Sequence, residues 1–439
     1  MKFSKLALAT VLAAVLTTTA ADAANWLTLQ GTEPAGSTDR FRLWGFIQPQ
    51  YVYNKNTKLK AGPFAGQDAV FNQVPPERNS SNTFQLRRAR IGVRGTNFPL
   101  DSKVNYFFLV EAGKNGITEF GSDIAATDAS ITLSYIPGAR IRVGQFKTPT
   151  AEEGLQAIQV FDYANFTNVT DQLLLERFVD GDGSDTTTSN RPNGSVGAFR
   201  DIGVQVFDTF KYGDWEHSYA GMVGNGNGLN RSDNNNEKDV YLYWSSELVF
   251  GGEGPRRQGW KMFAWGQDGE RTLEYVGGVA GDQDFDRERW GVGTTFRKGK
   301  WRAAAEYVKA DGMILNGTDG GAVPGSAENG DPTAIASVNM APDGEADGWY
   351  VHAGYAVTPK IELDIRYDYL DRLSDSDAGE REFDTLTLGA QYFFNKKTRA
   401  VVNYEFRNQD APGFSSSAPP NEIADGLEDR LTLQLLAIF

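Results

Sequence analysis

The sequence predicts an all-β fold, a transmembrane antiparallel up-and-down barrel of about 16 strands. Three observations support this prediction. Segments of about ten residues alternate apolar with polar side chains, the spacers between them alternate short with long, and the chain ends on an aromatic residue. The composition agrees, since the 439 residues include 27 Phe, 17 Tyr, 9 Trp and 48 Gly but no Cys. Without cysteine the chain has no disulfides and no thiolate metal sites.

Residues 1–23 predict a cleaved signal peptide. Two lysines precede a short apolar run, and Ala21-Asp22-Ala23 supplies an A-x-A cleavage site. The apolar run is too short to anchor the chain by spanning a bilayer. We therefore expect an exported protein whose mature chain, residues 24–439, forms a single barrel domain without an internal linker.

The alternating segments predict the positions of the strands. They lie at 41–53, 84–96, 102–112, 127–136, 139–146, 200–209, 214–224, 238–250, 259–267, 286–297, 300–311, 347–357, 360–371, 381–394, 398–408 and 428–439. An even number of strands is typical of bacterial outer-membrane barrels.

The spacers predict which end of the barrel faces which compartment. The short ones are 97–100, 137–138, 211–214, 298–299, 359–360 and 395–397. The long ones are 54–83, 147–199, 225–237, 268–285, 312–346, 372–380 and 409–427. Tight periplasmic turns and long outer loops produce this alternation. The spacer 147–199 is the predicted constriction loop, folded into the lumen, and Thr150 with Glu153 fits the capping box of a short helix.

Arginines alternate with apolar residues in the segment 84–96. Arg88, Arg90 and Arg94 share one face of an extended chain, and the apolar residues between them share the other. Arginines turned toward lipid would cost roughly 2–4 kcal/mol each near the membrane midplane, so we expect them to face the lumen. The same alternation in neighbouring segments adds Arg42, Arg140 and Arg142. Such a wall lowers the barrier for anions; the alternative is that these arginines pair with lumenal carboxylates and brace the loops.

Acidic residues are predicted across the lumen from this arginine wall. Glu362, Asp364 and Asp368 share the inward face of a later strand. In the predicted constriction loop, Glu152 and Glu153 are expected to oppose the arginines across a narrowed passage; the alternative is that Glu153 only caps the helix. These residues predict a polarised pore with a basic side and a more acidic side.

The long loops are rich in acid, at 281–288, at 371–382 and beyond Glu422. At a cell surface such carboxylates can bind divalent cations that bridge lipopolysaccharide; the alternative is a solvated, charged loop. No other cofactor is predicted. The net charge of −14 argues against a nucleic-acid partner.

Three segments resemble a known family: FQLRRARIGVRG (84–95), ARIRVGQFKTPTAEEGL (139–155) and VGNGNGLNRSDNNNEKD (223–239). They look like the hallmark segments of the phosphate-selective porin O and P family of Gram-negative outer membranes. The resemblance implies a homotrimer of barrels whose lumenal arginines guide phosphate or polyphosphate. The matching positions are Arg88, Arg90, Arg94 and Arg142, with Lys147 just beyond them. The acid-rich loops depart from the lysine-rich loops of the phosphate channels.

The end of the chain, RLTLQLLAIF, places alternate apolar residues and the terminal Phe439 on one face. A terminal aromatic on such a strand resembles the recognition signal that the outer-membrane assembly machinery reads.

These features together predict an outer-membrane porin that passes small hydrophilic solutes and ions by diffusion, with a preference for anions or phosphate. One alternative is a plugged surface barrel or adhesin, which would show no steady conductance. A secreted β-rich hydrolase is a weaker alternative, because the chain has only 2 His and lacks the G-x-S-x-G and H-E-x-x-H motifs. We therefore expect no enzymatic activity.

Overall fold

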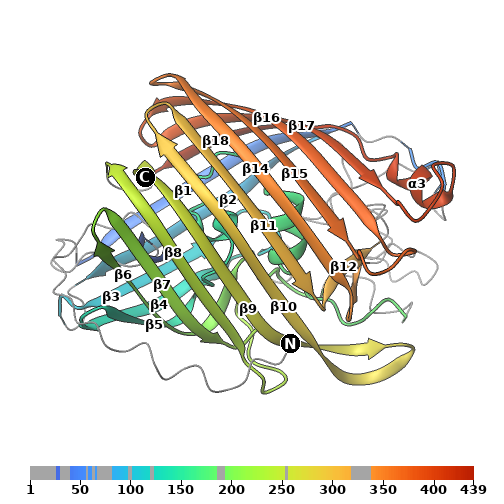
Figure 1. The fold of residues 1–439 in the computed structure, drawn as a ribbon, viewed down its shortest axis with the longest axis horizontal. Coiled ribbons are helices and arrows are strands. Elements are labelled where there is room, and N and C mark those ends of the chain that lie inside the picture. Colours follow the sequence, from blue (N-terminus) through green and yellow to red (C-terminus); the bar gives the residue numbers. More distant parts are fainter. Residues whose placement is uncertain are drawn as a thin grey trace.

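The computed structural model describes residues 26–29, 40–55, 58–61, 65–66, 82–96, 101–118, 123–184, 193–252, 256–317 and 338–439. Sixteen antiparallel strands form one closed barrel, and Figure 1 shows them crossing the molecule at a common tilt. The predicted fold class is therefore confirmed. The predicted signal peptide, residues 1–23, lies outside the described residues.

The barrel strands follow the chain order, and each pairs with the next one in the barrel. They are β1 (Arg42–Asn54), β2 (Asn82–Thr96), β3 (Val104–Glu111), β4 (Ala125–Ile136), β5 (Ala139–Lys147), β6 (Arg200–Tyr212), β7 (Trp215–Gly224), β8 (Asp239–Gly251), β9 (Gln258–Val276), β10 (Val279–Lys298), β11 (Trp301–Asp311), β14 (Glu345–Thr358), β15 (Ile361–Arg372), β16 (Arg381–Asn395), β17 (Thr398–Asp410) and β18 (Arg430–Ile438). The barrel closes where β1 pairs with β18, from Phe46↔Ile438 to Asn54↔Arg430.

Of the remaining elements, α1 (Trp26–Leu29) precedes β1 and the others lie in the connections between barrel strands. The others are α2 (Glu152–Leu155), the π-helical turn η1 (Thr170–Leu174), the small sheet of β12 (Ile314–Gly317) and β13 (Val338–Ala341), and α3 (Pro419–Ala424). Among the described residues, no helix is both long enough and apolar enough to cross a membrane.

The side chains alternate between a polar lumen and an apolar outer face. On β2, Arg88 and Arg90 are buried inside the barrel, whereas Ile91 is exposed on the outside. On β15, Glu362 and Asp364 are buried and Leu363 between them is exposed. Exposed apolar residues on every second position are the pattern that a lipid-facing wall requires. The predicted orientation of these strands is therefore correct.

The expectation of a long loop at 268–285 is wrong. β9 and β10 continue as paired strands to a two-residue turn at Gly277 and Gly278, and the hairpin extends past its neighbours (yellow in Figure 1). Both glycines have positive φ, 61° and 78°, as a tight hairpin turn demands. The outward residues on this extension are acidic rather than apolar, so the alternation that marks a lipid-facing strand disappears there.

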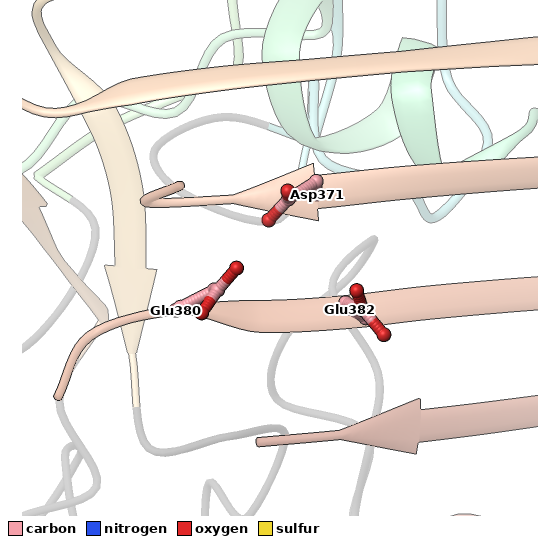
Figure 2. A group of neighbouring side chains, drawn as sticks. All are labelled: Asp371, Glu380 and Glu382. Carbon is pink, nitrogen blue, oxygen red and sulfur yellow. The ribbon is translucent and has the colours of Figure 1, made fainter. Parts of the chain in front are cut away.

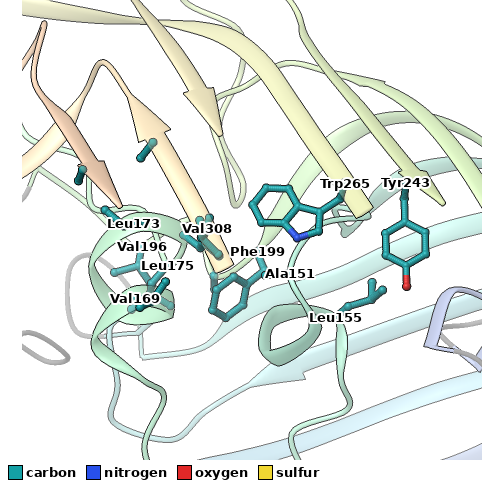
Figure 3. Close-up of a cluster of buried hydrophobic side chains, with 14 of the residues drawn as sticks. Ala151, Leu155, Val169, Leu173, Leu175, Val196, Phe199, Tyr243, Trp265 and Val308 are labelled. Carbon is teal, nitrogen blue, oxygen red and sulfur yellow. The ribbon is translucent and has the colours of Figure 1, made fainter. Parts of the chain in front are cut away.

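The connection between β5 and β6 folds into the lumen. We call its described parts, residues 148–184 and 193–199, the lumenal loop. Its apolar side chains pack against lumen-facing residues of the barrel wall in one cluster. Figure 3 shows this cluster, in which Leu155, Val169 and Phe199 of the loop approach Trp265 of β9 and Val308 of β11. The loop therefore packs on wall residues of several strands, from β8 and β9 to β15 and β16.

The C-terminal residue completes the barrel seam. The Phe439 amide donates to the carbonyl of Gly45 at 3.0 Å, and the Gly45 amide donates back at 3.2 Å. A Cβ atom on Gly45 would lie 2.5 Å from the Phe439 ring and 2.4 Å from the carbonyl oxygen of Arg90. Glycine at this position therefore lets the terminal aromatic ring cover the first strand.

Replacing Gly45 by Ala is expected to lower the free energy of unfolding by about 1–3 kcal/mol, because either the seam or the Phe439 ring must move. Urea titration of the detergent-solubilised protein, read by heat-modifiable gel mobility, measures this change. Gly266→Ala is the matched control, since nothing lies within 4 Å of a Cβ at that strand position. Equal midpoints for the two variants would contradict the role given to the seam.

Candidate functional site: a basic pocket at the lumenal loop

Five basic side chains meet where the barrel wall faces the lumenal loop. We call this site the basic pocket; Arg87, Arg88, Arg90, Lys147 and Arg200 line one side of it, and loop residues that include Gly154, Gln156 and Phe166 line the other. Its volume is about 40 Å³, enough for roughly three water molecules by this measure. An ion that passes through it must exchange part of its hydration shell for protein groups.

Two of the five basic groups are ion-paired. Arg90 Nε lies 2.7 Å from Glu111 Oε2 on β3, and Arg200 Nη2 lies 3.0 Å from Asp128 Oδ2 on β4. Each of these pairs is buried, so its charges are neutralised locally. The two pairs hold neighbouring strands and the pocket wall together.

Arg88 and Lys147 contact neutral acceptors instead. Arg88 Nη1 donates to the amide oxygen of Gln48 at 3.1 Å. Lys147 Nζ donates to the main-chain carbonyls of Gly154 at 2.8 Å and Gln156 at 2.5 Å, at the end of α2. Their positive charges therefore add to two neutralised pairs and give the pocket an excess of positive charge.

The sequence analysis missed Arg87 and Arg200. A β-bulge in β2, opposite Gln48 and Pro49, adds one residue at Arg87. Phe84 is exposed on one side of the bulge and Ile91 on the other, although their numbers differ in parity, because an extra residue reverses the alternation. This reversal of apolar parity is visible in the sequence and could have located the bulge.

Arg200 could not have been found by alternation. It begins β6, directly after Ala198 and Phe199, which both have positive φ of 52° and 62°. The regular extended pattern starts only beyond this turn, so the position of Arg200 in the strand does not indicate the direction of its side chain.

The other predicted arginines lie toward the short-turn end of the barrel. Arg142 Nη2 donates to the carbonyl of Leu27 at 3.1 Å, and Arg94 Nη2 donates to that of Leu29 at 3.3 Å. Arg140 lies 3.4 Å from Asp208. Arg42 is exposed at the start of β1. The structure therefore divides the predicted arginine wall into the basic pocket and a second group near the short turns, of which Arg94 and Arg142 contact α1.

Two of the predicted opposing acids hold the lumenal loop to the far wall. Glu152 Oε2 lies 2.5 Å from Lys261 Nζ on β9, and its other oxygen accepts from Trp26 Nε1 at 2.9 Å. Glu153 borders the basic pocket but is bound 3.1 Å from Arg366 of β15 and accepts from the Thr167 hydroxyl at 2.7 Å. Glu152 is thus directed to β9 rather than to the arginines.

The expected capping box at the start of α2 is wrong. The N-cap residue is Ala151, and no side chain caps the helix. The Thr150 hydroxyl contacts the Thr148 hydroxyl at 3.3 Å. Glu153 is drawn instead to a lumenal arginine, because a buried carboxylate gains more from a charged partner than from a helix amide.

The predicted acidic wall is neutralised by arginines from neighbouring strands. Arg302 of β11 bridges Glu362 at 2.5 Å, Asp364, and Asp162 of the lumenal loop at 3.0 Å. Burial alone would raise the pKa of Asp162, but Arg302 and its neighbours hold that pKa well below the usual range. The side of the lumen opposite the basic pocket is therefore a mixed-charge surface and not an acidic one.

Asp368, another acid of the predicted acidic wall, is also bound by neighbouring groups. It accepts from the main-chain amide and the side-chain amide of Asn168 at 2.9 and 2.8 Å, and it lies 3.9 Å from Arg366.

The inward direction of Arg302 could have been predicted from the sequence, because Arg302 shares the parity of Glu306 on the same strand. Its partners on β15 and in the loop are far apart in sequence, and alternation does not identify them.

Residues 58–412 match the phosphate-selective porin O and P family. The chain belongs to this family. A comparison with curated proteins found no match. Among solved structures, OmpF of Salmonella typhi in complex with daunomycin has a TM-score of 0.56 at 15% identity, covering 91% of this chain and 97% of that one. The DcaP channel of Acinetobacter baumannii has a TM-score of 0.51 at 13% identity, covering 91% of this chain and 97% of that one. An anion-selective porin from Comamonas acidovorans has a TM-score of 0.51 at 13% identity, covering 91% of this chain and 99% of that one.

These likenesses confirm the predicted family, fold and class of function. The protein is a porin of the Gram-negative outer membrane and forms a channel. The structural similarity at these identities concerns the fold, so the properties of the basic pocket rest on this porin's own residues.

Glu176 is a further anchor of the porin's lumenal loop. Its carboxylate lies 2.6 Å from Arg271 and 3.3 Å from Arg287. Burial alone would raise the pKa of Glu176, but these two arginines outweigh burial and lower it. A carboxylate with a lowered pKa in the folded state stabilises that state above its unfolded pKa, and the contribution is lost as pH falls through the folded value.

We expect single-channel current noise to stay constant from pH 7 to about 5 and to rise below about pH 4, where glutamates become protonated. The physical reason is release of the lumenal loop from Arg271 and Arg287. The Glu176→Gln variant serves as the comparison in planar bilayers, since its noise should already be high at pH 7 and change less on acidification. Identical pH profiles for both proteins would contradict this assignment.

Three carboxylates meet at the outer end of the β15–β16 hairpin. Asp371, Glu380 and Glu382 each offer an oxygen within 4.8 Å of the other two, and Figure 2 shows them at the ends of the two strands. Asp371 and Glu382 are direct cross-strand partners, which is unfavourable for like charges alone. The expectation that acid-rich outer loops bind divalent cations stays a prediction, and this cluster is the place to examine it.

Proposed function

We propose that the basic pocket makes this porin prefer anions, including phosphate, over cations during passive diffusion of small hydrophilic solutes. The observation that carries the proposal is the placement of Arg88 and Lys147 beside neutral acceptors at a pocket of about 40 Å³. Guanidinium and ammonium groups replace part of the hydration shell of an anion and repel a cation at the same point.

We propose a modest rather than a strict preference. The mixed-charge surface around Arg302 offers carboxylates as well as guanidinium groups. The outer extension of β9 and β10 also carries acids on its exposed face, at Asp268, Glu270, Asp284 and Asp286. These acids lower the local concentration of anions at the outer side.

The test is the zero-current potential of the purified porin in a planar bilayer under a KCl gradient. We expect a potential of the sign that marks greater chloride than potassium permeability. Addition of phosphate at constant ionic strength is expected to reduce the chloride current by competition for the basic pocket. A potential of the opposite sign, or an unaltered chloride current in phosphate, would overturn the proposal.

A plugged barrel is the second candidate function, and α1 is the observation that favours it. Leu27 of α1 is buried in the apolar cluster of the lumenal loop, and the carbonyls of Leu27 and Leu29 accept from Arg142 and Arg94. These backbone oxygens take the place that an anion would occupy beside the two arginines. Conductance measurements separate a porin that α1 narrows from one that it closes.

Replacing Trp26 and Leu27 together by Ala is expected to raise single-channel conductance by roughly 1.5- to 3-fold, because the apolar contacts and the Trp26–Glu152 hydrogen bond that hold α1 in the lumen are removed. Bilayer recordings in 1 M KCl measure the change. Phe41→Ala, an exposed aromatic residue outside the lumen, is the control. Unchanged conductance in the double variant would show that α1 does not limit the pore.

We also propose the assembly route and partners that the family implies. Residues 1–23 are removed on export, Phe439 is the signal for the outer-membrane assembly machinery, and the mature chain forms a homotrimer surrounded by lipid and lipopolysaccharide. The covered Gly45–Phe439 seam supports a role of the terminal residue in barrel closure. Mass spectrometry of the purified protein and its mobility in unheated gels test the cleavage site and the trimer.

A further inference from the structure

A second cavity lies on the outer side of the lumenal loop. It has a volume of about 440 Å³, within the range of small-molecule sites. The end of η1 and the lumenal loop that follows it, the connection between β7 and β8, the β9–β10 extension, β12 and β13 enclose it. The described residues that line it divide into an apolar side and a basic side.

The apolar side comes from the outer loops and from β9. Met313, Leu315, Met340 and Leu273 are all buried and pack together with Val179 of the lumenal loop. Methionine side chains are flexible and polarisable, so they adapt to apolar ligands of different shape. An apolar wall of this kind offers nothing to a fully hydrated inorganic ion.

Five guanidinium groups line the cavity. Arg177 is paired with Asp171 at 3.0 Å, and Arg231 donates to Asn193. The other three form the basic side beside the apolar wall and share two carboxylates. Arg271 pairs with Asp239 at 2.8 Å and with Glu176 at 2.6 Å. Arg287 Nε lies 3.3 Å from Oε1 of the same Glu176. The Nη1 atom of Arg287 has no hydrogen-bond partner among the described residues. This side of the cavity therefore requires more negative charge than its own carboxylates supply.

Arg289 accounts for the excess of positive charge. Its hydrogen bonds in the described part of the chain go to main-chain carbonyls, those of Leu173, Glu288, Asp311, Gly312 and Met313. Carbonyl dipoles solvate a guanidinium group but leave its charge in place. The charge of Arg289 is thus not neutralised by an ion pair beside the apolar wall.

The rim of the cavity adds a limit on the charge of a ligand. Asp180, Glu274 and Asp282 line it at the solvent side. Their carboxylates repel a dianion more strongly than a monoanion. A ligand that satisfies all three surfaces has one negative charge and an apolar body.

We infer that this cavity binds monocarboxylates with an aromatic or short aliphatic body and admits them to the pore. The carboxylate lies toward Arg287 and Arg289, and the apolar body lies against Met313 and Met340. The inference deepens the proposed function, on which its transport aspect rests, by naming a solute class that inorganic phosphate does not represent. Binding in the cavity is independent of the basic pocket.

The test compares four probes added to the outer side of the reconstituted porin: benzoate, acetate, benzyl alcohol and inorganic phosphate. Acetate has the carboxylate charge of benzoate without its aromatic ring, and benzyl alcohol has the aromatic ring without the charge. The half-blocking concentration of benzoate for the KCl current is expected to be at least tenfold lower than that of each other probe. Equal values for benzoate and acetate, or for benzoate and phosphate, would overturn the inference.

Variants of the apolar wall decide the location. Met340→Gln and Met313→Gln are each expected to raise the half-blocking concentration of benzoate about fivefold and to leave that of acetate unchanged. Phe414→Gln, at an exposed outer-loop residue, is the matched control and should match the unsubstituted porin. Heat-modifiable mobility shows that the variants are folded; an unchanged benzoate block in both folded methionine variants would overturn the assigned site.

The same membranes, without any of the four probes, give the KCl zero-current potential, which reports on chloride preference and not on benzoate binding. A porin without chloride preference that still binds benzoate tenfold more tightly than acetate would refute the proposed function and support the cavity. A porin that prefers chloride but has equal half-blocking concentrations for benzoate and acetate would support the proposed function and refute the cavity.

Discussion

Replacing Arg88 and Lys147 together by Gln is expected to lower the ratio of chloride to potassium permeability at least about tenfold. A unit charge 4 Å from a permeating ion contributes between about 1 kcal/mol in water and about 4 kcal/mol at a protein surface, and about 1.4 kcal/mol corresponds to a factor of ten. The two side chains are the members of the basic pocket whose contacts go to neutral acceptors. Their removal leaves Arg87 and two neutralised ion pairs in the pocket.

The measurement is the zero-current potential in a KCl gradient, which should move toward the potassium equilibrium potential. Arg42→Gln combined with Lys298→Gln removes the same charge at exposed positions near the short-turn end and controls for the net charge of the protein. The single Arg88→Gln variant should give an intermediate shift and leaves the Lys147 contact with α2 in place. An equal shift in the control would locate ion selectivity outside the basic pocket.

Replacing Arg302 by Met is expected to have the largest effect on stability. Arg302 is buried and bridges Asp162, Glu362 and Asp364. Removal of one partner from a buried ion-pair network leaves uncompensated charges and costs about 3–5 kcal/mol. Because Asp162 belongs to the lumenal loop, we also expect release of this part of the loop and noisier single-channel currents.

Urea unfolding in detergent, followed by tryptophan fluorescence and gel mobility, measures the loss. A triple variant that adds Glu362→Gln and Asp364→Asn to Arg302→Met should recover most of the stability, since two of the three unpaired negative charges are then removed and Arg256 still lies 3.8 Å from the third, Asp162. An unfolding midpoint for Arg302→Met equal to that of the original porin would mean that Arg302 is not the centre of this network. Failure of the triple variant to recover would assign the loss to packing.

Much of the fold follows from the sequence, because strand alternation is a local property with a period of two residues. The outward direction of Ile91, the inward direction of Arg88 and Glu362, and the folding of the β5–β6 connection into the lumen all agree with the alternation and the spacer lengths. The β9–β10 extension was missed because it leaves the membrane, where outward residues no longer have to be apolar.

The sequence by itself determined that the chain forms a barrel and which side chains face the lumen. Only the tertiary structure decided which lumenal charges meet: that Glu152 binds Lys261, that Arg302 neutralises Glu362, and that Arg88 meets neutral acceptors. The physical reason is the distance along the sequence over which each property is set. The face that a residue occupies depends on its immediate neighbours. Its charged or polar partners lie on other strands and loops, 40 to 109 residues away in these three contacts, and the fold of the barrel brings them together.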